Sequence, residues 1–407
     1  MIPKQEFVET EIGKIPEEWH KITLGELITF QRGHDLPLTK RKDGQYPIVA
    51  SNGIIGCHDE FKAKGPGVTI GRSGNLGEPF FVKQDYWPHN TTLYSVKFHS
   101  SDPRFVYYFL KTLNLKGFNA GSAVPTLNRN HIHPIEVVVP KNINEQRAIA
   151  SILGSLDDKI ALNRSMNSTL EAIGQALFRR WFVDFEFPNE EGKPYRSSGG
   201  EMVKTELGEV PKGWRVGTLG DICEITMGQS PPGETYNEIG DGLPFYQGIS
   251  DFGFRFPSRR VYCTAPTRFA EEGDVLLSVR APVGTFNIAD ERCAIGRGVA
   301  ALRLKGKHSG YLYYLLHATQ TGWNKFEAEG TVFGSVTKSD VHDFKVILPS
   351  ETLRNWFGSL VETLDKQITI NEKQSRTLAT IRDSLLPKLM SGEIRVSTNS
   401  NLNNKNK

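Results

Sequence analysis

Two long stretches of the chain carry apolar residues at helical spacing. In the first, apolar residues recur mostly every three or four positions, at Ile149, Ile152, Leu156, Ile160, Met166, Leu170, Ile173, Leu177 and Trp181. In the second, the same spacing joins Leu353, Trp356, Leu360, Leu364, Ile368, Leu378, Ile381, Leu385 and Leu389. This spacing is typical of the seam of a coiled-coil helix. We therefore expect two long helices, over residues 145–184 and 351–395.

An asparagine interrupts each apolar series near the middle of the expected helix, Asn163 in the first and Asn371 in the second. A polar seam residue costs stability but can fix the register of paired helices; the alternative is that each asparagine faces water. If the helices pack antiparallel, we expect these two residues to approach each other. The positions that we assign to the coiled-coil seam are Leu156, Asn163, Leu170, Leu177, Leu364, Asn371, Leu378 and Leu385.

The segments that precede the long helices differ from them in composition and in hydrophobic pattern. Residues 20–140 and 215–349 are rich in Gly, Pro, Asn and aromatic residues, with short β-leaning runs such as PFFVKQ, TLYSVKF and DVLLSVR. Apolar runs such as RFVYYFLKTL and YLYYLLHATQ indicate helices between these strands. Each segment therefore predicts an α+β globule with long loops.

The chain is duplicated. Thr10 to Leu27 read TEIGKIPEEWHKITLGEL, and Thr205 to Ile222 read TELGEVPKGWRVGTLGDI, with 8 of 18 positions identical. The long helices match again over LDDKIALNRSMNSTLEAIGQAL and LDKQITINEKQSRTLATIRDSL, whereas the middles of the copies diverge almost completely. A common scaffold with two unlike interiors suggests two modules that perform one task on different targets; the alternative is drift of loops after duplication. We expect Trp19 and Trp214, in the shared openings, to pack within the scaffold.

These patterns divide the chain into six segments. The expected boundaries are a first globule at 1–144, a first helix at 145–184, a connecting segment at 185–204, a second globule at 205–350, a second helix at 351–395, and a polar tail at 396–407 that we expect to be disordered.

Composition limits the classes of function. Lys plus Arg total 49 against 46 Asp plus Glu, a formal charge of +3, so any basic surface must be local. The start of the chain lacks a secretory pattern, and no run approaches 18 apolar residues; we expect a cytoplasmic protein that does not span a membrane. The four cysteines form no CxxC pair, which disfavours a zinc site or a disulfide framework.

Catalytic constellations are missing from the sequence. We find no GxxxxGK[ST] loop, no GxGxxG after a strand, no HExxH and no GxSxG. His131 and His133 form an HxH on an expected strand and could place two metal ligands on one face. The second copy has Asp340 and His342 there, without a clustered third ligand, so capping or packing is favoured. We expect no catalytic residue and no metal site.

We therefore interpret the chain as a binding protein. Its divergent interiors contain polar residues that are candidates for ligand contacts. Arg, Lys, Asn and Gln on loops can grip phosphates and recognise base edges. The candidate DNA-binding residues are Lys40, Arg41, Lys42, Arg72, Asn75, Asn128 and Arg129 in the first copy, and Gln229, Arg280, Arg297 and Lys338 in the second.

With these features the chain resembles the specificity (S) subunits of type I restriction-modification systems. The resemblance rests on the paired openings, on FRRWFVDFEFPNEEGKPYRSSGGEMV, on MGQSPPGETYNEIGDGLPFYQG and on the closing SLLPKLMSGEI, and with the repeat order it covers nearly the whole chain. It implies an α+β fold of two globular target-recognition domains in pseudo-twofold tandem repeat, separated by two long antiparallel coiled-coil helices. Each domain would read one half of a bipartite DNA site.

The resemblance also implies partners. An S subunit is not itself catalytic: it binds double-stranded DNA and docks methylation (M) subunits and, where present, restriction (R) subunits. It binds no cofactor, whereas S-adenosylmethionine, ATP and magnesium belong to the partner subunits. Two alternatives stay open: a duplicated adaptor that binds protein or carbohydrate, and a solitary nuclease with tandem domains.

Overall fold

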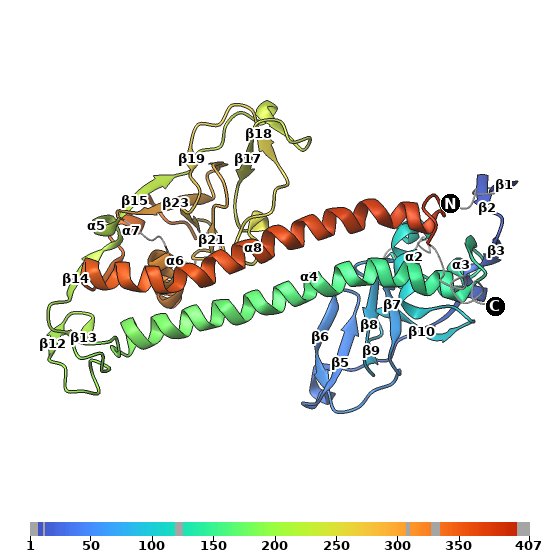
Figure 1. The fold of residues 1–407 in the computed structure, drawn as a ribbon, viewed down its shortest axis with the longest axis horizontal. Helices are drawn as coiled ribbons and strands as arrows, with labels where there is room; N and C mark the ends of the chain where they lie inside the picture. The colour runs from blue at the N-terminus through green and yellow to red at the C-terminus, as the bar shows by residue number, and fades with distance from the viewer. Residues whose placement is uncertain (1–6, 11–12, 119–124, 307–309, 327–333, 397–407) are drawn as a thin grey trace, which may run out of the picture. The chain divides into compact units, whose positions relative to one another are not determined.

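The computed structural model describes residues 7–10, 13–118, 125–306, 310–326 and 334–396 (Figure 1). The chain forms two compact units: Met1–Asn163 with Lys373–Lys407, and Arg164–Glu372. Two long helices, α4 (Ile143–Phe178) and α8 (Glu351–Met390), each contribute one part to each unit. The expected mixture of helices and sheets is confirmed. The expected tail from residue 397 lies outside the described residues.

The first unit is built on an antiparallel four-stranded sheet. Its strands are β4 (Ile28–Arg32), β10 (Thr92–Phe98), β7 (Gly67–Gly71) and β8 (Pro79–Val82), in that order. Helix α2 (Pro103–Thr112) contacts β7 and β8; it begins after Asp102, whose carboxylate accepts from the amides of Arg104 and Phe105. The buried core between sheet and helices includes Ile149 and Leu153 of α4 and Leu389 of α8. The ends of both long helices thus complete this globule.

Smaller elements surround this sheet. They are β1 (Phe7–Thr10), β2 (Gly13–Pro16), β3 (Trp19–Thr23), α1 (Leu24–Leu27), η1 (Leu38–Lys40), β5 (Tyr46–Ala50), β6 (Gly53–His58), β9 (Trp87–Pro88), η2 (Leu115–Phe118), α3 (Arg129–Ile132) and β11 (Glu136–Pro140). β3 pairs with β11, and β6, β5 and β9 form a three-stranded sheet.

The second unit repeats the four-stranded sheet. Strands β15 (Cys223–Met227), β23 (Val299–Leu304), β20 (Val275–Ser278) and β21 (Phe286–Ile288) follow the same order and are again antiparallel. Helix α6 (Gly310–Ala318) contacts β21, as α2 contacts β8. The shared strand order confirms that the sequence repeat is a structural repeat.

The two copies differ in their second sheet. The second unit has five strands, in the order β16 (Tyr236–Asn237), β18 (Tyr262–Cys263), β17 (Leu243–Tyr246), β22 (Cys293–Ile295) and β19 (Phe269–Ala270). The other elements are π-helical η3 (Arg179–Val183), β12 (Met202–Thr205), β13 (Gly208–Pro211), β14 (Arg215–Thr218), α5 (Leu219–Ile222), η4 (Gly233–Thr235), η5 (Ile249–Asp251), η6 (Gln320–Phe326), α7 (Lys338–His342) and β24 (Lys345–Leu348). The sequences of both sheets diverge between the copies, but the strand order is kept in the four-stranded sheet and differs in the second sheet.

The paired openings are scaffold, as expected. In both, a threonine caps a one-turn helix: Thr23 with Glu26 before α1, and Thr218 with Asp221 before α5, each in a reciprocal capping box. Trp19 is 3% exposed in the first core, and Trp214 stacks on Phe187 at 5.2 Å between ring centroids. The repeated letters TLGEL and TLGDI therefore encode the end of a strand, a helix cap and a helical turn.

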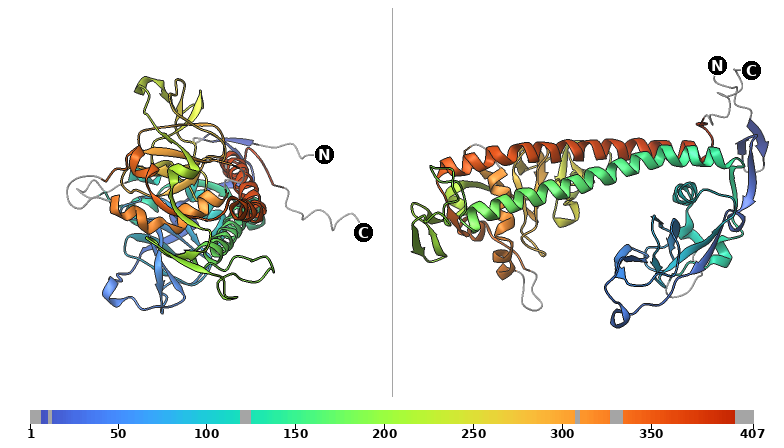
Figure 2. Two further views of the ribbon diagram at one scale, coloured as in Figure 1. Left: turned by 90° about the vertical axis from the view of Figure 1, so that its left-hand side faces the viewer. Right: turned by 60° about the horizontal axis from the view of Figure 1, so that its bottom comes forward.

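Within each unit the segments of α4 and α8 run antiparallel, side by side (Figure 2). In the first unit, Asn163 Nδ2 donates to Ser375 Oγ at 3.2 Å; in the second, Asn371 Nδ2 donates to Asn167 Oδ1 at 2.8 Å. Asn163 is 0% and Asn371 is 3% exposed, so the alternative that they face water is wrong. Because the two asparagines belong to different units, their mutual approach stays a prediction.

The prediction of an apolar seam between the helices is partly wrong. Six of its residues are instead exposed: Ile152 37%, Met166 37%, Ile173 43%, Trp356 49%, Leu360 43% and Ile381 41%. The six leucines assigned to the seam, Leu156, Leu170, Leu177, Leu364, Leu378 and Leu385, are half-buried. Buried polar or small residues fill inward positions of α4, at Asn163, Asn167, Glu171 and Gly174.

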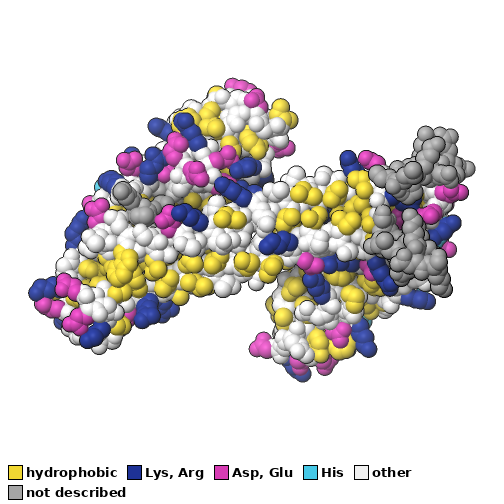
Figure 3. Space-filling view, in the orientation of Figure 1, with side chains coloured by type: hydrophobic (Ala, Val, Ile, Leu, Met, Phe, Trp, Pro, Cys, Tyr) yellow, Lys and Arg dark blue, Asp and Glu magenta, His cyan; other side chains and the backbone are white. Residues whose placement is uncertain are grey.

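The reason lies in the hydrogen bonds that these polar residues make. They pair with partners on α8 or on the globule, so the helix turns part of its apolar face to the surface. Figure 3 shows hydrophobic side chains gathered along the long helices.

None of the helices in the described ranges has the length and apolar character needed to cross a membrane.

Candidate nucleic-acid interface

A hollow of about 350 Å³ lies at one corner of the four-stranded sheet of the first unit. It opens where β4 and β7 end and where β10 begins. Its lining residues are Gln31, Arg32, Arg72, Leu93, Thr126, Leu127, Asn128 and Arg129.

Local geometry brings separate segments to this corner. Leu127 N donates to Arg72 O at 2.8 Å, and Ser73 forms an antiparallel bridge with Thr126, so the loop after β7 is joined to the segment before α3. The Asn128 side chain caps α3 by accepting from the amide of Asn130, which makes Arg129 the first helical residue. These contacts hold the backbone of Arg72 and Arg129 at the corner of the sheet.

The first hollow is cationic. Arg32, Arg72 and Arg129 line it, and no acidic residue does so among the described residues. Arg32 and Arg129 are exposed and Arg72 is half-buried. Burial lowers the pKa of nearby His133, and the positive charge of Arg129 lowers it further. The hollow thus suits an anionic or acceptor-rich ligand.

A second hollow, of about 320 Å³, lies in the second unit. It is lined by Ser230, Gln247, Gly248, Ile249, Ser250, Arg280, Ala281, Arg297 and Gly298. Arg297 donates to Ser230 Oγ from its amide at 3.3 Å and from Nε at 3.4 Å. Arg280 and Arg297 are exposed, and within the described ranges this lining has no acidic residue.

The two hollows occupy equivalent corners of the repeated sheet. Arg280 follows β20 and bridges to Ser335 just before α7, as Ser73 follows β7 and bridges to Thr126 just before α3. Arg297 and Gly298 precede β23, the counterpart of β10. The corner is shared, but the side chains differ: Gln31 and Arg129 contribute to the first lining, and Gln247 and Ser250 to the second.

The structure brings together five of the eleven candidate DNA-binding residues. Arg72, Asn128 and Arg129 line the first hollow, and Arg280 and Arg297 line the second. The remaining candidates, Lys40, Arg41, Lys42, Asn75, Gln229 and Lys338, are outside both linings. Their role in binding stays a prediction.

Three of the candidates outside the hollows have local partners. Arg41 Nε donates to Leu36 O at 3.4 Å, and Lys42 Nζ lies 3.6 Å from an Asp59 carboxylate oxygen. Gln229 N donates to Ile295 O at 3.0 Å, directly before the lining residue Ser230. Lys338 is the first residue of α7 and is exposed.

Sequence reasoning missed the lining residues Gln31, Arg32, Ser230 and Gln247. The first two end strand β4 in the stretch FQRG, and Ser230 follows β15 in the stretch MGQS. Both stretches lie at the end of the first strand that follows a shared opening. That position in the repeat was the available signal.

The HxH motif does not lie on a strand, so that prediction is wrong. His131 is on α3, and His133 caps its C-terminal end. His133 Nε2 accepts from Phe30 N at 3.1 Å, and its ring stacks on Phe30 with centroids 6.3 Å apart. No group of three or more His, Cys, Asp or Glu residues suited to hold a metal occurs in the described part of the chain. His133 therefore has the packing role that was favoured over metal binding.

Comparison with protein families assigns the repeat. The type I restriction modification DNA specificity domain matches the chain twice, over residues 16–172 and 211–380. The chain belongs to this family. Its two recognition domains are the two globules that carry the hollows.

Individual relatives agree over nearly the full length of this specificity subunit. The type I restriction enzyme MjaIX specificity subunit of Methanocaldococcus jannaschii is 28% identical, covering 96% of this chain and 97% of the relative. The EcoDI specificity subunit of Escherichia coli is 23% identical, covering 94% and 90%. The crystal structure of the type I restriction-modification S subunit from M. genitalium has the same fold, with a TM-score of 0.62 at 19% identity, covering 91% and 96%.

Proposed function

We propose that this chain reads a bipartite DNA site, with one half-site bound at each recognition domain, and that it catalyses no reaction itself. The observation that carries the proposal is the pair of arginine-lined hollows at equivalent corners of the repeated sheet. Equivalent positions suit one task, and unlike linings suit two different half-sites.

The chemistry of the linings supports base recognition. An arginine can donate two hydrogen bonds to the O6 and N7 atoms of guanine, and a glutamine can pair with the N6 and N7 atoms of adenine. Arg72 with Gln31 in the first hollow, and Arg280 with Gln247 in the second, supply both types. The remaining arginines would contact phosphates and make the affinity depend on salt.

The exposed apolar residues of the long helices support docking of methylation subunits. Ile173, Trp356 and Leu360 are each more than 40% exposed in the second unit, and large exposed apolar surface is typical of protein interaction sites. In this proposal methylation subunits supply S-adenosylmethionine, and restriction subunits supply ATP and magnesium chemistry. The complex works where its DNA is, in the cytoplasm.

The test is a methylation map. The chain is expressed with its methylation subunit, and N6-methyladenine is mapped across the host genome. We expect a motif of two half-sites with a fixed gap. Arg72→Ala should change or relax the sequence preference at one half-site, and Arg280→Ala that at the other. Each substitution removes from one hollow a guanidinium that can donate two hydrogen bonds to a base.

The control is Lys212→Ala, which removes an exposed lysine paired with Glu201 on the β12–β13 hairpin. This variant should leave the motif unchanged. A motif without a gap, or two arginine variants that alter the same half-site, would contradict the proposal. DNA affinity that does not fall as salt rises would favour the adaptor alternative, and DNA cleavage by the isolated chain would favour the nuclease.

A further inference from the structure

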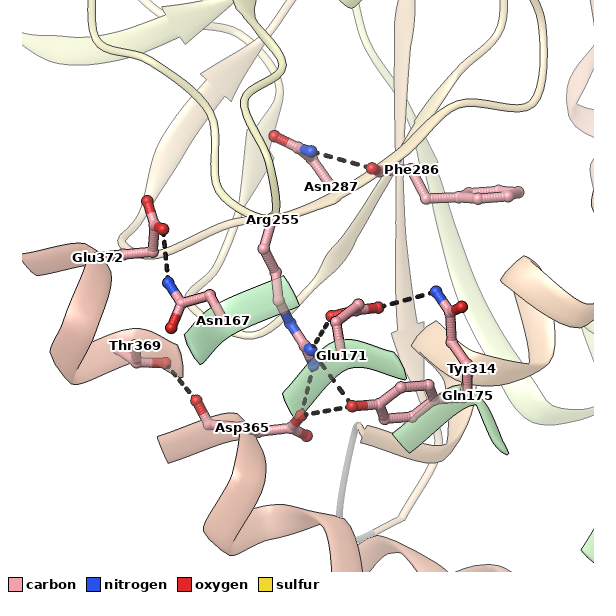
Figure 4. Close-up of polar contacts among 10 residues, drawn as sticks. All are labelled: Asn167, Glu171, Gln175, Arg255, Phe286, Asn287, Tyr314, Asp365, Thr369 and Glu372. Atoms are coloured by element: carbon pink, nitrogen blue, oxygen red, sulfur yellow. Dashed lines mark hydrogen bonds and ion pairs between the residues drawn. The ribbon is translucent and has the colours of Figure 1, made fainter. Parts of the chain in front are cut away.

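Arg255 is a buried cation that the proposed reading mechanism does not use. It lies in the loop between η5 and β18, within the divergent part of the second recognition domain, and is 1% exposed. Its guanidinium reaches both long helices: Nη1 lies 2.5 Å from Glu171 Oε2 on α4, and Nη2 lies 2.5 Å from Asp365 Oδ1 on α8 (Figure 4). One side chain of the recognition domain thus contacts both helices at once.

Aromatic residues of α6 enclose the guanidinium. Its central carbon lies 4.3 Å from the ring centroid of Tyr313 and 5.4 Å from that of Tyr314. The Tyr314 hydroxyl accepts from Arg255 Nη1 at 3.3 Å and donates to Asp365 Oδ1 at 3.1 Å. Stacking and hydrogen bonds exclude water, which strengthens the ion pairs.

The loop that carries Arg255 is attached to the four-stranded sheet. Asn287 on β21 accepts from Gly253 N and donates to Gly253 O, both at 3.1 Å, and Ile288 N donates to Arg255 O at 2.8 Å. Asn287 is buried, and its side chain points toward this loop (Figure 4). Contacts are therefore continuous from the sheet, through Arg255, to α4 and α8.

We propose that Arg255 is a positioning residue that holds the second recognition domain at a fixed place along the two helices and so makes the complex strict about the gap between half-sites. The proposal rests on the proposed function, because gap strictness has meaning only for a bipartite site. Arg255 lines neither hollow in the described structure, so it affects spacing and not base choice.

The first recognition domain is tied to the helices in a different way. There, Tyr108 of α2 donates to Asp157 Oδ2 at 2.6 Å, as Tyr314 donates to Asp365, and Asp157 and Asp365 are equivalent in the repeat. The guanidinium beside Asp157 comes from Arg382 of α8, at 2.6 Å. At Asp157 the cation therefore belongs to the helix pair, whereas Lys83 and Arg104 of the first globule pair with the neighbouring Asp158 of α4 at 2.9 and 2.8 Å.

The second unit has no room for a cation at the position that corresponds to Arg382. The equivalent residue is Gly174, where an added Cβ would lie 2.3 Å from the Tyr314 hydroxyl oxygen. The recognition domain supplies the cation instead. Loss of Arg255 would leave buried Glu171 and half-buried Asp365 without their common partner, and unpaired charges removed from water are unfavourable.

The experiment uses the full chain with its methylation subunit, and host genomic DNA is the probe. N6-methyladenine is mapped for wild type, Arg255→Met, Arg255→Lys and the triple variant Arg255→Met/Glu171→Gln/Asp365→Asn. We expect Arg255→Met to keep both half-site sequences but to raise methylation at sites with a gap one base pair longer or shorter by tenfold or more. Arg255→Lys keeps the charge without the fork and should give an intermediate increase.

The triple variant covers the case in which Arg255→Met does not fold, because it removes all three charges of the cluster together. It should fold and show the same relaxed gap. Arg259→Met is the matched control: Arg259 follows in the same loop, is 40% exposed and pairs with Glu291, not with a helix. It should keep the wild-type gap.

Two failures are distinguishable. A wild-type chain that directs no gapped motif overturns the proposed function and this proposal together. A wild-type gapped motif that both Arg255→Met and the triple variant retain with unchanged strictness overturns only the role of Arg255. The same holds if folded variants change the bases of a half-site and not the gap.

Discussion

At the residue scale, His317 should make the stability of the second unit depend on pH. The imidazole packs against Tyr313 and Phe286, with ring centroids 4.4 and 5.4 Å away, and its Nε2 atom is buried without a hydrogen-bond partner in the described structure. Burial, together with the nearby charge of Arg255, lowers its pKa to about 4. The folded state therefore keeps this histidine neutral at pH values where the unfolded chain protonates it.

The sign follows from proton binding. Between the unfolded pKa, about 6.5, and the folded pKa the unfolded state binds more protons, so the free energy of unfolding falls as pH falls. From pH 7 to pH 5 this group should cost about 2 kcal/mol. His317→Phe removes the titrating group. The free energy of unfolding of the variant, measured by urea denaturation, should therefore fall less than that of wild type over this range.

A matched control separates this effect from general acid sensitivity. His131 is exposed on α3 of the first unit, and His131→Gln should leave the pH dependence as in wild type. If His317→Phe loses as much stability as wild type between pH 7 and pH 5, buried His317 is not the source.

At the element scale, the sequence predicted the existence of the long helices but not their inward face. Apolar spacing located α4 and α8, and the shared openings were interpreted as scaffold, but the capping boxes at Thr23 and Thr218 were not predicted. The inward face of α4 depends on Glu171, whose partner Arg255 is 84 positions away in a loop without periodicity. Because that contact is non-local, no pattern along α4 could predict it.

The candidate site was predictable to a similar extent. Residue chemistry selected Arg72 and Arg280, and the structure places both at the ends of equivalent strands. Their neighbours Gln31 and Gln247 lie on other strands or loops that meet only once the strand order is known. The sequence contains the residue types, but the order of strands decides which of them share a hollow.

The exposed apolar face of α8 gives a prediction about assembly. Leu360 is 43% exposed, so Leu360→Glu should leave the unfolding midpoint nearly unchanged, since surface substitutions usually change stability by less than about 0.5 kcal/mol. If a methylation subunit buries this side chain, the substitution should weaken its binding about tenfold or more, because a buried leucine contributes about 1.5–3 kcal/mol. Titration calorimetry or pull-down with the methylation subunit measures the loss.

The control for this variant is Lys366→Ala on the same helix. Lys366 is exposed and pairs with Glu362 four residues earlier, so its removal changes a polar part of the surface. Wild-type affinity is expected for this control. Equal weakening by both variants would argue against a docking role for the apolar residues, and no weakening by Leu360→Glu would exclude Leu360 from the interface.

At the scale of the whole molecule, the proposed function makes helix length a measure of half-site separation. Four residues inserted in α4 and four in α8, at matched positions of the antiparallel pair, lengthen each helix by about 6 Å and rotate the following face by about 40°. At about 3.4 Å per base pair, the preferred gap should grow by one or two base pairs. The half-site bases should stay the same, because neither hollow includes residues of these helices.

The insertion should be placed between Asn163 and Asn167 and between Asn371 and Ser375, so that the tether of each recognition domain to its own helix segment stays intact. A methylation map then reads the gap directly. Insertion in α4 alone is the informative control: it breaks the register of Asn163 with Ser375 and should reduce methylation without creating a new gap. A matched insertion that leaves the gap at its wild-type length would show that the helices do not set the spacing, and the strictness ascribed to Arg255 would then need another origin.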